Sequence, residues 1–147
     1  MDTIKTEKRV FPTNMLRVCV DQFTEDVKGR VYSKLSGTPI MFENCCELLL
    51  KTDAMFDRCG YPQTFQEKHD FNGKKVSNCF TSPEIFLADE ELETKCGQLT
   101  TLDVFVSSRR NTSWQGIIKQ VNKDAVIEFR SDIELLSAIK HLLMKGI

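Results

Sequence analysis

The sequence predicts an α+β fold in which one β-β-β-α unit occurs twice, as a pseudo-two-fold pair with both helices on one face of an antiparallel sheet. Three observations predict it. Residues 16–58 and 102–145 match each other at an offset of 86 or 87. Each copy alternates apolar and polar residues before it changes to the spacing of a helix. A capping signature stands at each expected helix start.

Each copy opens with a strand in which apolar residues recur two positions apart. A polar loop follows, and a glycine opens the second strand at residues 29–32 and 116–119. Turn residues then lead to a short third strand at residues 40–42 and 126–129. The matches are Leu16 with Leu102, Val18 with Val104 and Val20 with Val106 at offset 86, then Gly29 with Gly116, Ile40 with Ile127, Phe42 with Phe129, Glu47 with Glu134, Leu48 with Leu135 and Leu49 with Leu136 at offset 87.

A helix closes each copy, and we expect these helices at residues 45–59 and 132–145. Asn44 and Ser131 are short polar residues with a glutamate three positions later, which is the pattern of a capping box. The buried stripes also correspond, because apolar residues recur at the first, second, eighth and ninth positions of one face. These residues are Leu48, Leu49, Met55 and Phe56 in the first helix and Leu135, Leu136, Leu142 and Leu143 in the second.

The matches divide the chain into an N-terminal tail (1–13), a first copy (14–60), a connector (61–100) and a second copy (101–147). The connector is long for a compact domain. It contains phenylalanines at positions 65, 71, 80 and 86, so we expect it to pack on the body. Within it, Ser82 and Pro83 suit the start of a short helix that would run to Thr94.

Composition excludes several classes of function. The 147 residues carry a net charge of −1, so no overall field attracts nucleic acid, and a nucleic-acid partner is disfavoured. The apolar runs are too short for a signal peptide or a membrane span, which predicts a cytoplasmic protein without membrane contact. The six cysteines lack C-x-x-C spacing and stand apart from both histidines. We therefore expect free thiols, no metal site and no cofactor.

Part of the second copy resembles a known group of proteins. Trp114-Gln115-Gly116 is a W-x-G strand, and residues 129–135 read F-R-S-D-I-E-L at a helix start. These motifs resemble a loose group of small bacterial proteins, mostly from Firmicutes. The group has no assigned activity, so the resemblance implies the fold and no site.

The loop at residues 109–114 is the most site-like stretch of the chain. Arg109 and Arg110 can grip an anion, Asn111 and Ser113 can donate or accept hydrogen bonds, and Trp114 offers a stacking plane. If the loop is a recognition site, the arginines and Trp114 are exposed and converge on one surface. The alternative is a solvated hairpin loop whose tryptophan folds back onto the sheet. Half of the PilZ signature for cyclic di-GMP also fits here, but its upstream R-x-x-x-R is missing.

No catalytic motif is present, so we expect a protein that is not an enzyme. The leading hypothesis is an interaction or regulatory protein that binds another macromolecule, most naturally a protein, through the sheet face or the 109–114 loop. A homo-oligomer formed through sheet edges is a further option. The alternative is a small-ligand or nucleotide sensor with a pocket between the two copies.

Overall fold

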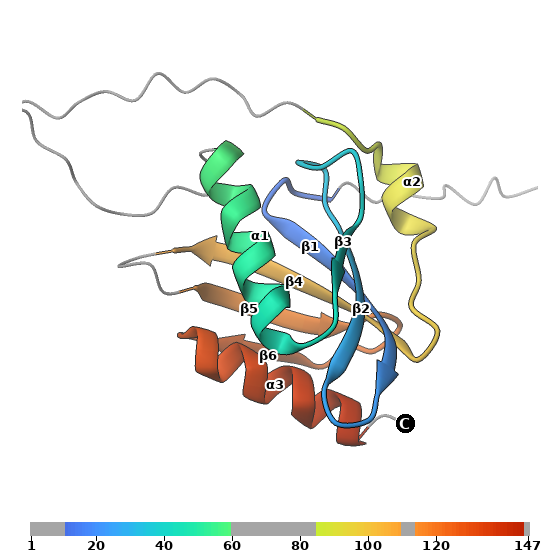
Figure 1. The fold of residues 1–147 in the computed structure, drawn as a ribbon, viewed down its shortest axis with the longest axis vertical. Coiled ribbons are helices and arrows are strands. Elements are labelled where there is room, and N and C mark those ends of the chain that lie inside the picture. The colour runs from blue at the N-terminus through green and yellow to red at the C-terminus, as the bar shows by residue number, and fades with distance from the viewer. Residues whose placement is uncertain (1–10, 60–84, 110–113, 146–147) are drawn as a thin grey trace, which may run out of the picture.

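The computed structural model describes residues 11–59, 85–109 and 114–145. Within them the chain forms an α+β fold with one six-stranded sheet (Figure 1). The elements are, in chain order, β1 (Met15–Phe23), β2 (Val27–Tyr32), β3 (Ile40–Phe42), α1 (Cys45–Cys59), α2 (Asp89–Glu93), β4 (Thr100–Ser108), β5 (Gln115–Gln120), β6 (Val126–Phe129) and α3 (Asp132–Lys145).

The strands lie in the order β3-β2-β1-β4-β5-β6, and every neighbouring pair is antiparallel. β1 and β4 therefore form the centre of the sheet, and β3 and β6 form its edges. The order β-β-β-α occurs on each side of the centre. The prediction of an α+β protein with an antiparallel sheet is confirmed.

Each central strand carries an irregularity near its end, where it pairs with its neighbour. β1 shifts register to β2 between Val20 and Gln22, and β4 shifts register to β5 between Val106 and Ser108. Next to each shift stands a glycine whose Cβ, if present, would collide with a backbone carbonyl of the central strand. The close approach of two backbones is therefore what requires glycine at these positions.

One face of the sheet, which we call the inner face, is covered by α1 and α3 (Figure 1). α1 packs on β2 and β3, and α3 packs on β5 and β6. Both helices share one hydrophobic core with the central strands, because alternate residues of β1 and β4 point toward them. Core side chains of the strands include Leu16, Val18, Val20, Leu102, Val104 and Val106, and those of the helices include Leu48, Met55, Phe56, Leu135, Ile139 and Leu143.

Side-chain caps fix both long helices where the sequence predicts them. The Glu47 amide donates to Asn44 Oδ1 at 2.8 Å, and the Glu134 amide donates to Ser131 Oγ at 3.1 Å. Each glutamate carboxylate accepts in return from the amide of the residue before the cap, rather than from the cap itself. Each helix start thus gains two bonds for groups that lack partners within the helix.

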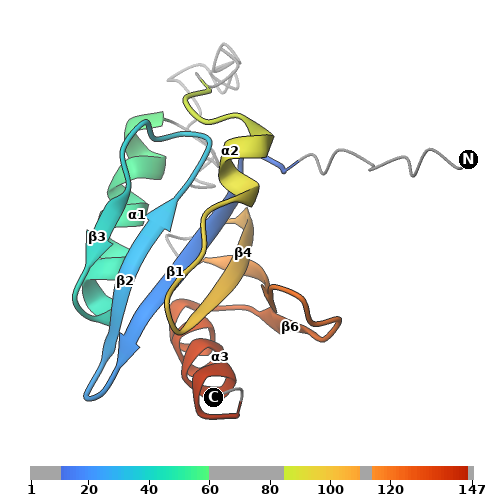
Figure 2. The ribbon, with the colours of Figure 1, turned by 90° about the vertical axis from the view of Figure 1, so that its right-hand side faces the viewer.

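The opposite face, which we call the outer face, carries α2 and residues 11–14 over the central strands (Figure 2). Beneath them Arg17 and Asp103 form a buried two-bond ion pair, with N–O distances of 2.8 and 2.9 Å. Arg17 also donates to the carbonyls of Leu92 and Glu93, and its guanidinium lies 5.0 Å from the centre of the Phe11 ring. The pair therefore ties the two halves of the sheet to the layer that covers them.

The predicted connector helix is shorter than expected. α2 begins at Asp89, and Ala88, which precedes it, has an extended backbone and no side-chain cap. The prediction of a helix from Pro83 is wrong for residues 85–88, because the Phe86 amide donates to the Lys34 carbonyl and holds this stretch extended. Ser82 and Pro83, like the phenylalanines at 65, 71 and 80, lie outside the described residues.

Candidate functional site

Arg109 does not face solvent. Its side chain is 1% exposed and lies against α1, where Nη1 is 3.1 Å from Asp53 Oδ1 and 2.8 Å from Asp57 Oδ1. The guanidinium also lies 5.3 Å from the centre of the Phe56 ring. Its charge is thus neutralised and stacked within the protein.

Trp114 is 2% exposed and packs edge-on against Phe56, with ring centres 5.6 Å apart. Its Nε1 donates to Asp53 Oδ1 at 2.9 Å, and its amide donates to Asp132 Oδ1 at 2.9 Å. The tryptophan therefore joins the start of β5 to both α1 and the first turn of α3. A buried indole needs such a partner for its N–H.

A recognition site on this loop required Arg109 and Trp114 to be exposed, and for these two residues that hypothesis is wrong, because both are buried. The physical reason is the acidic pair on α1: Asp53 and Asp57 stand four residues apart, so they lie on one side of the helix and draw in both donors. That spacing is the signal in the sequence by which these contacts could have been found. Arg110, Asn111 and Ser113 lie outside the described residues.

The outer face over β1 and β2 is occupied by a polar network. Arg30 donates to both carboxylate oxygens of Asp21, at 3.1 and 3.2 Å, and to the Tyr32 hydroxyl at 2.8 Å. Residues 95–98 lie across it: the Cys96 carbonyl accepts from Arg30, and the Gln98 amide donates to Asp21. Burial alone raises the pKa of Asp21, but these hydrogen bonds outweigh it and hold that pKa below its usual range.

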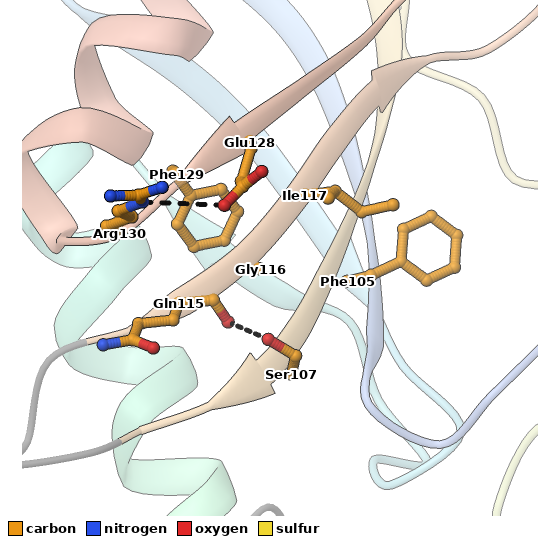
Figure 3. A pocket seen from close by; sticks show the side chains of 8 residues that line it. All are labelled: Phe105, Ser107, Gln115, Gly116, Ile117, Glu128, Phe129 and Arg130. Carbon is orange, nitrogen blue, oxygen red and sulfur yellow. Dashed lines mark hydrogen bonds and ion pairs between the residues drawn. The ribbon is translucent and has the colours of Figure 1, made fainter.

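The outer face over β4, β5 and β6 instead holds an open pocket of about 440 Å³ (Figure 3). Phe105 and Ile117 form its apolar side, and Ser107, Gln115, Glu128 and Arg130 form its polar side. Ser107 donates to the Gln115 carbonyl at 2.9 Å, and Arg130 pairs with Glu128 at 3.6 Å. The Ser107 hydroxyl and the two charged groups of the rim thus have partners, and the apolar surface between them is open.

The apolar surface extends beyond the pocket. Ile117 is 38% exposed and Val126, on the edge strand, is 52% exposed. Phe105 marks the border, because it also touches the small cluster of Phe11, Met15 and Leu92 under α2. Among the described residues, none covers the outer face on the far side of Phe105. Exposed apolar side chains with polar ones around them are typical of a docking site for another molecule.

A second pocket, of about 340 Å³, lies between the edge strand β6 and the helix α3. Ile127 and Glu128 line it from the strand, and Ile133, Glu134, Ser137, Ala138 and His141 line it from the following helix turns. Neither of these two pockets lies between the halves of the sheet, where the shared core fills the space.

The described thiols differ in burial. Cys19, Cys45, Cys46, Cys59 and Cys96 are free thiols. Burial raises the pKa of Cys19 to about 11 and that of Cys45 to about 12, so both are protonated and unreactive at neutral pH. Within residues 11–59, 85–109 and 114–145, no three metal-binding side chains gather in one place.

Comparisons with protein-family models, with curated proteins and with solved structures find no match to this chain. In the part of the chain that the structure describes, none of the helices has both the length and the apolar character needed to cross a bilayer.

Proposed function

We propose that this chain is an internally duplicated, non-enzymatic interaction protein that binds another protein through the outer face of β4, β5 and β6. The duplication is the first part of the proposal. It relates β1-β2-β3-α1 to β4-β5-β6-α3 by a pseudo-two-fold axis. The binding face is the second part, and it follows from how the two units differ.

The strand registers support the duplication. Val20 opposes Gly29 as Val106 opposes Gly116, and the register shift follows at once in both pairs. The third strands pair in the same way, since Phe42 opposes Gly29 and Phe129 opposes Gly116. Every one of these correspondences has the offset of 86 or 87 that the sequence carries. Unrelated hairpins have no reason to share both register and irregularity.

The contact between the units also fits a two-fold axis. Arg17 opposes Asp103 at the centre of the β1–β4 pairing, and these positions differ by 86. On either side, Leu16 opposes Val104 and Val18 opposes Leu102. In an isologous dimer of single units, the central residue meets its own copy. A duplicated chain can instead place opposite charges there, as Arg17 and Asp103 do.

One observation supports the binding proposal most: the outer face is covered by the chain itself in the first unit and open over β5 and β6 in the second. In the first unit Arg30 and Asp21 bind residues 95–98 of the chain's own connector. The equivalent positions of the second unit are Ile117 and Ser107, and they border the open pocket. The outer face of the second unit thus has an isoleucine and a serine where the first has an ion pair under a covering segment.

The chemistry of this face suits a protein partner. An apolar centre with a partnered polar rim resembles the core and rim of protein interfaces. Glu128 and Arg130 present both signs of charge, so the face favours neither an anionic polymer nor a basic one. Small-ligand binding stays the alternative prediction, since a volume of about 440 Å³ lies within the range of ligand sites.

The proposal is tested by site-specific photocrosslinking in the native host. A benzophenone amino acid replaces Ile117 in one variant and Leu50, an exposed residue of α1, in the control. We expect a discrete protein adduct from position 117, competed by excess unlabelled chain, and none from position 50. The captured protein is then purified and its affinity for the chain is measured directly.

Substitution completes the test. Ile117→Arg places a charge in the apolar centre and is expected to weaken that affinity by about tenfold or more. Leu50→Arg is the matched control and leaves it unchanged. The proposal fails if Ile117→Arg binds as the parent does, or if position 117 captures only another copy of this chain. A nucleotide that raises the thermal midpoint of the parent but not of Ile117→Arg would favour the alternative.

A further inference from the structure

The two edges of the sheet differ in whether their backbone groups are free to pair. At the β3 edge, Lys51 of α1 donates to the carbonyl oxygen of Met41 at 2.8 Å and also pairs with Glu47. The lysine therefore occupies an acceptor that another strand would need. A lysine on an edge strand is a common protection against edge-to-edge pairing.

The β6 edge lacks this protection. Glu128 opposes Ile117 as Met41 opposes Arg30, so its amide and carbonyl point away from the sheet as the Met41 carbonyl does. The residue at the position of Lys51, at the offset of 87, is Ala138. Among the described residues, no side chain bonds to the outer edge of β6. The pocket of about 340 Å³ beside Ala138 opens onto this edge instead.

We propose that β6 is a homodimer interface, where it pairs in antiparallel fashion with β6 of a second copy of this chain. Each copy then contributes six strands to one continuous sheet. The occupant is a second copy because the charges along the edge complement each other across a two-fold axis. This edge adjoins the pocket around Ile117, because Glu128 and Arg130 belong to both, whereas Ile117 itself lies in β5 and takes no part in the strand pairing.

Charge selects the register of the pairing. If the two-fold axis passes beside Ile127, Val126 of one copy lies opposite Glu128 of the other. Where the pairing continues past the ends of β6, Asp124 lies opposite Arg130. A shift of the axis to Glu128 would place two like charges directly opposite each other, which is destabilising. The first register is therefore the favoured one, and it keeps the outward-pointing residues in hydrogen-bonded pairs.

Apolar side chains also lie close to this two-fold axis. Ile127 of each copy meets its counterpart on the inner face, next to the pocket between β6 and α3. Ile133 of α3 is 77% exposed at this pocket and gains cover from the second copy. On the outer face, Val126 gains the same cover. Because Lys51 closes the β3 edge, pairing ends at two copies and does not continue into a fibre.

The test is the sedimentation of the full chain at micromolar concentrations. We expect a dimer, with twice the mass of the 16.9 kDa chain. Glu128→Pro removes the outward amide of β6 and no bond to β5, because proline lacks only that donor. We expect its dissociation constant to rise by about tenfold or more, since two equivalent bonds are lost. Met41→Pro, the equivalent change on β3, leaves the dimer unchanged.

A second set of variants reverses charges at the interface and so tests the dimer without introducing a proline. Asp124→Arg alone weakens the dimer, and Asp124→Arg combined with Arg130→Asp restores it, because the opposed pair is rebuilt across the axis. Circular dichroism confirms that each variant is folded. A monomeric parent, or a dimer that Glu128→Pro and Met41→Pro affect equally, would overturn the proposal. Dimers lost in Ile117→Arg but not in Glu128→Pro would place the interface elsewhere.

Discussion

Asp53 is a half-buried carboxylate that binds two buried side chains at once. Its Oδ1 accepts from both Arg109 and Trp114, two buried side chains from either end of the segment that links β4 to β5. Asp57 accepts from Arg109 alone. If the Asp53 side chain is removed, the guanidinium keeps Asp57 and the Asp53 carbonyl as acceptors. The indole N–H loses the one acceptor that it has among the described residues.

We predict that Asp53→Ala lowers the free energy of unfolding by about 1–2 kcal/mol, the usual cost of a buried donor left without an acceptor. Asp57→Ala is the control on the same helix and costs less, because it leaves the indole bonded. Urea unfolding followed by the fluorescence of Trp114, the only tryptophan, measures both. Midpoints that fall equally in the two variants would mean that the indole bond contributes nothing.

The thiols should separate into two classes by reactivity. Cys46 and Cys96 are exposed, whereas Cys19 and Cys45 are buried with raised pKa values. At pH 8 we expect iodoacetamide to modify Cys46 and Cys96 in the folded chain, and Cys19 and Cys45 only after unfolding. Peptide mass spectrometry reads each site. Fast labelling of Cys45 in the native chain would contradict the burial of the α1 start.

The same raised pKa values set the dependence of stability on alkaline pH. In the unfolded chain a thiol ionises near pH 9, whereas in the folded chain Cys45 holds its proton until about pH 12. The unfolded state therefore binds fewer protons between these limits, and stability falls as pH rises above 9. Cys45→Ala should make that fall shallower in urea titrations. An equal decline in both proteins would rule out this contribution.

Among the contacts of the helices and strands, the two N-caps agree most closely with what the sequence predicts. Asn44→Ala and Ser131→Ala should each cost about 1 kcal/mol of stability, the typical value of a lost N-cap. Asn44→Asp and Ser131→Asp keep an acceptor and serve as controls. Chemical denaturation measures all four. If the alanine and aspartate variants unfold together, the capping bonds do not contribute.

Elements with a strong periodic pattern could be predicted from the sequence, and elements without one could not. The strands around Val18 and Val104 and both long helices follow from alternation, helical spacing and caps. α2 could not be placed, because five residues carry no period and its start depends on a backbone bond from Phe86 to Lys34.

The candidate site could be predicted from the sequence even less well than α2. The sequence marks Arg109 and Trp114 as unusual, but it does not say whether they face solvent, since that depends on Asp53 in a helix more than fifty residues away. The pocket at Ile117 is lined in part by residues of the W-x-G and F-R-S motifs, but neither motif predicts a pocket. It exists because the connector covers one half of the outer face and leaves the other half open, which no local pattern encodes.

At the scale of the whole molecule, the Arg17–Asp103 pair holds the two halves together. Breaking a buried pair by removing one partner typically costs about 3–5 kcal/mol, because the other charge stays buried. We predict such a loss for Asp103→Asn in urea unfolding. The double variant Arg17→Met with Asp103→Leu should recover part of it. A double variant less stable than Asp103→Asn would show that the charges are needed for more than their mutual neutralisation.

The outer face is covered over β1, β2 and the part of β4 before Phe105, and it is open over β5, β6 and the end of β4. The proposed binding depends most on this difference. Hydroxyl-radical footprinting of the isolated chain at low concentration tests it directly. Ile117 and Ile118 are neighbours in β5, one at the open outer face and one in the inner core, so each controls for the other. We predict that Ile117 is oxidised readily, whereas Ile118 and Leu92 are protected. Equal protection of Ile117 and Ile118 would contradict the account, because the proposed binding face would then be covered already.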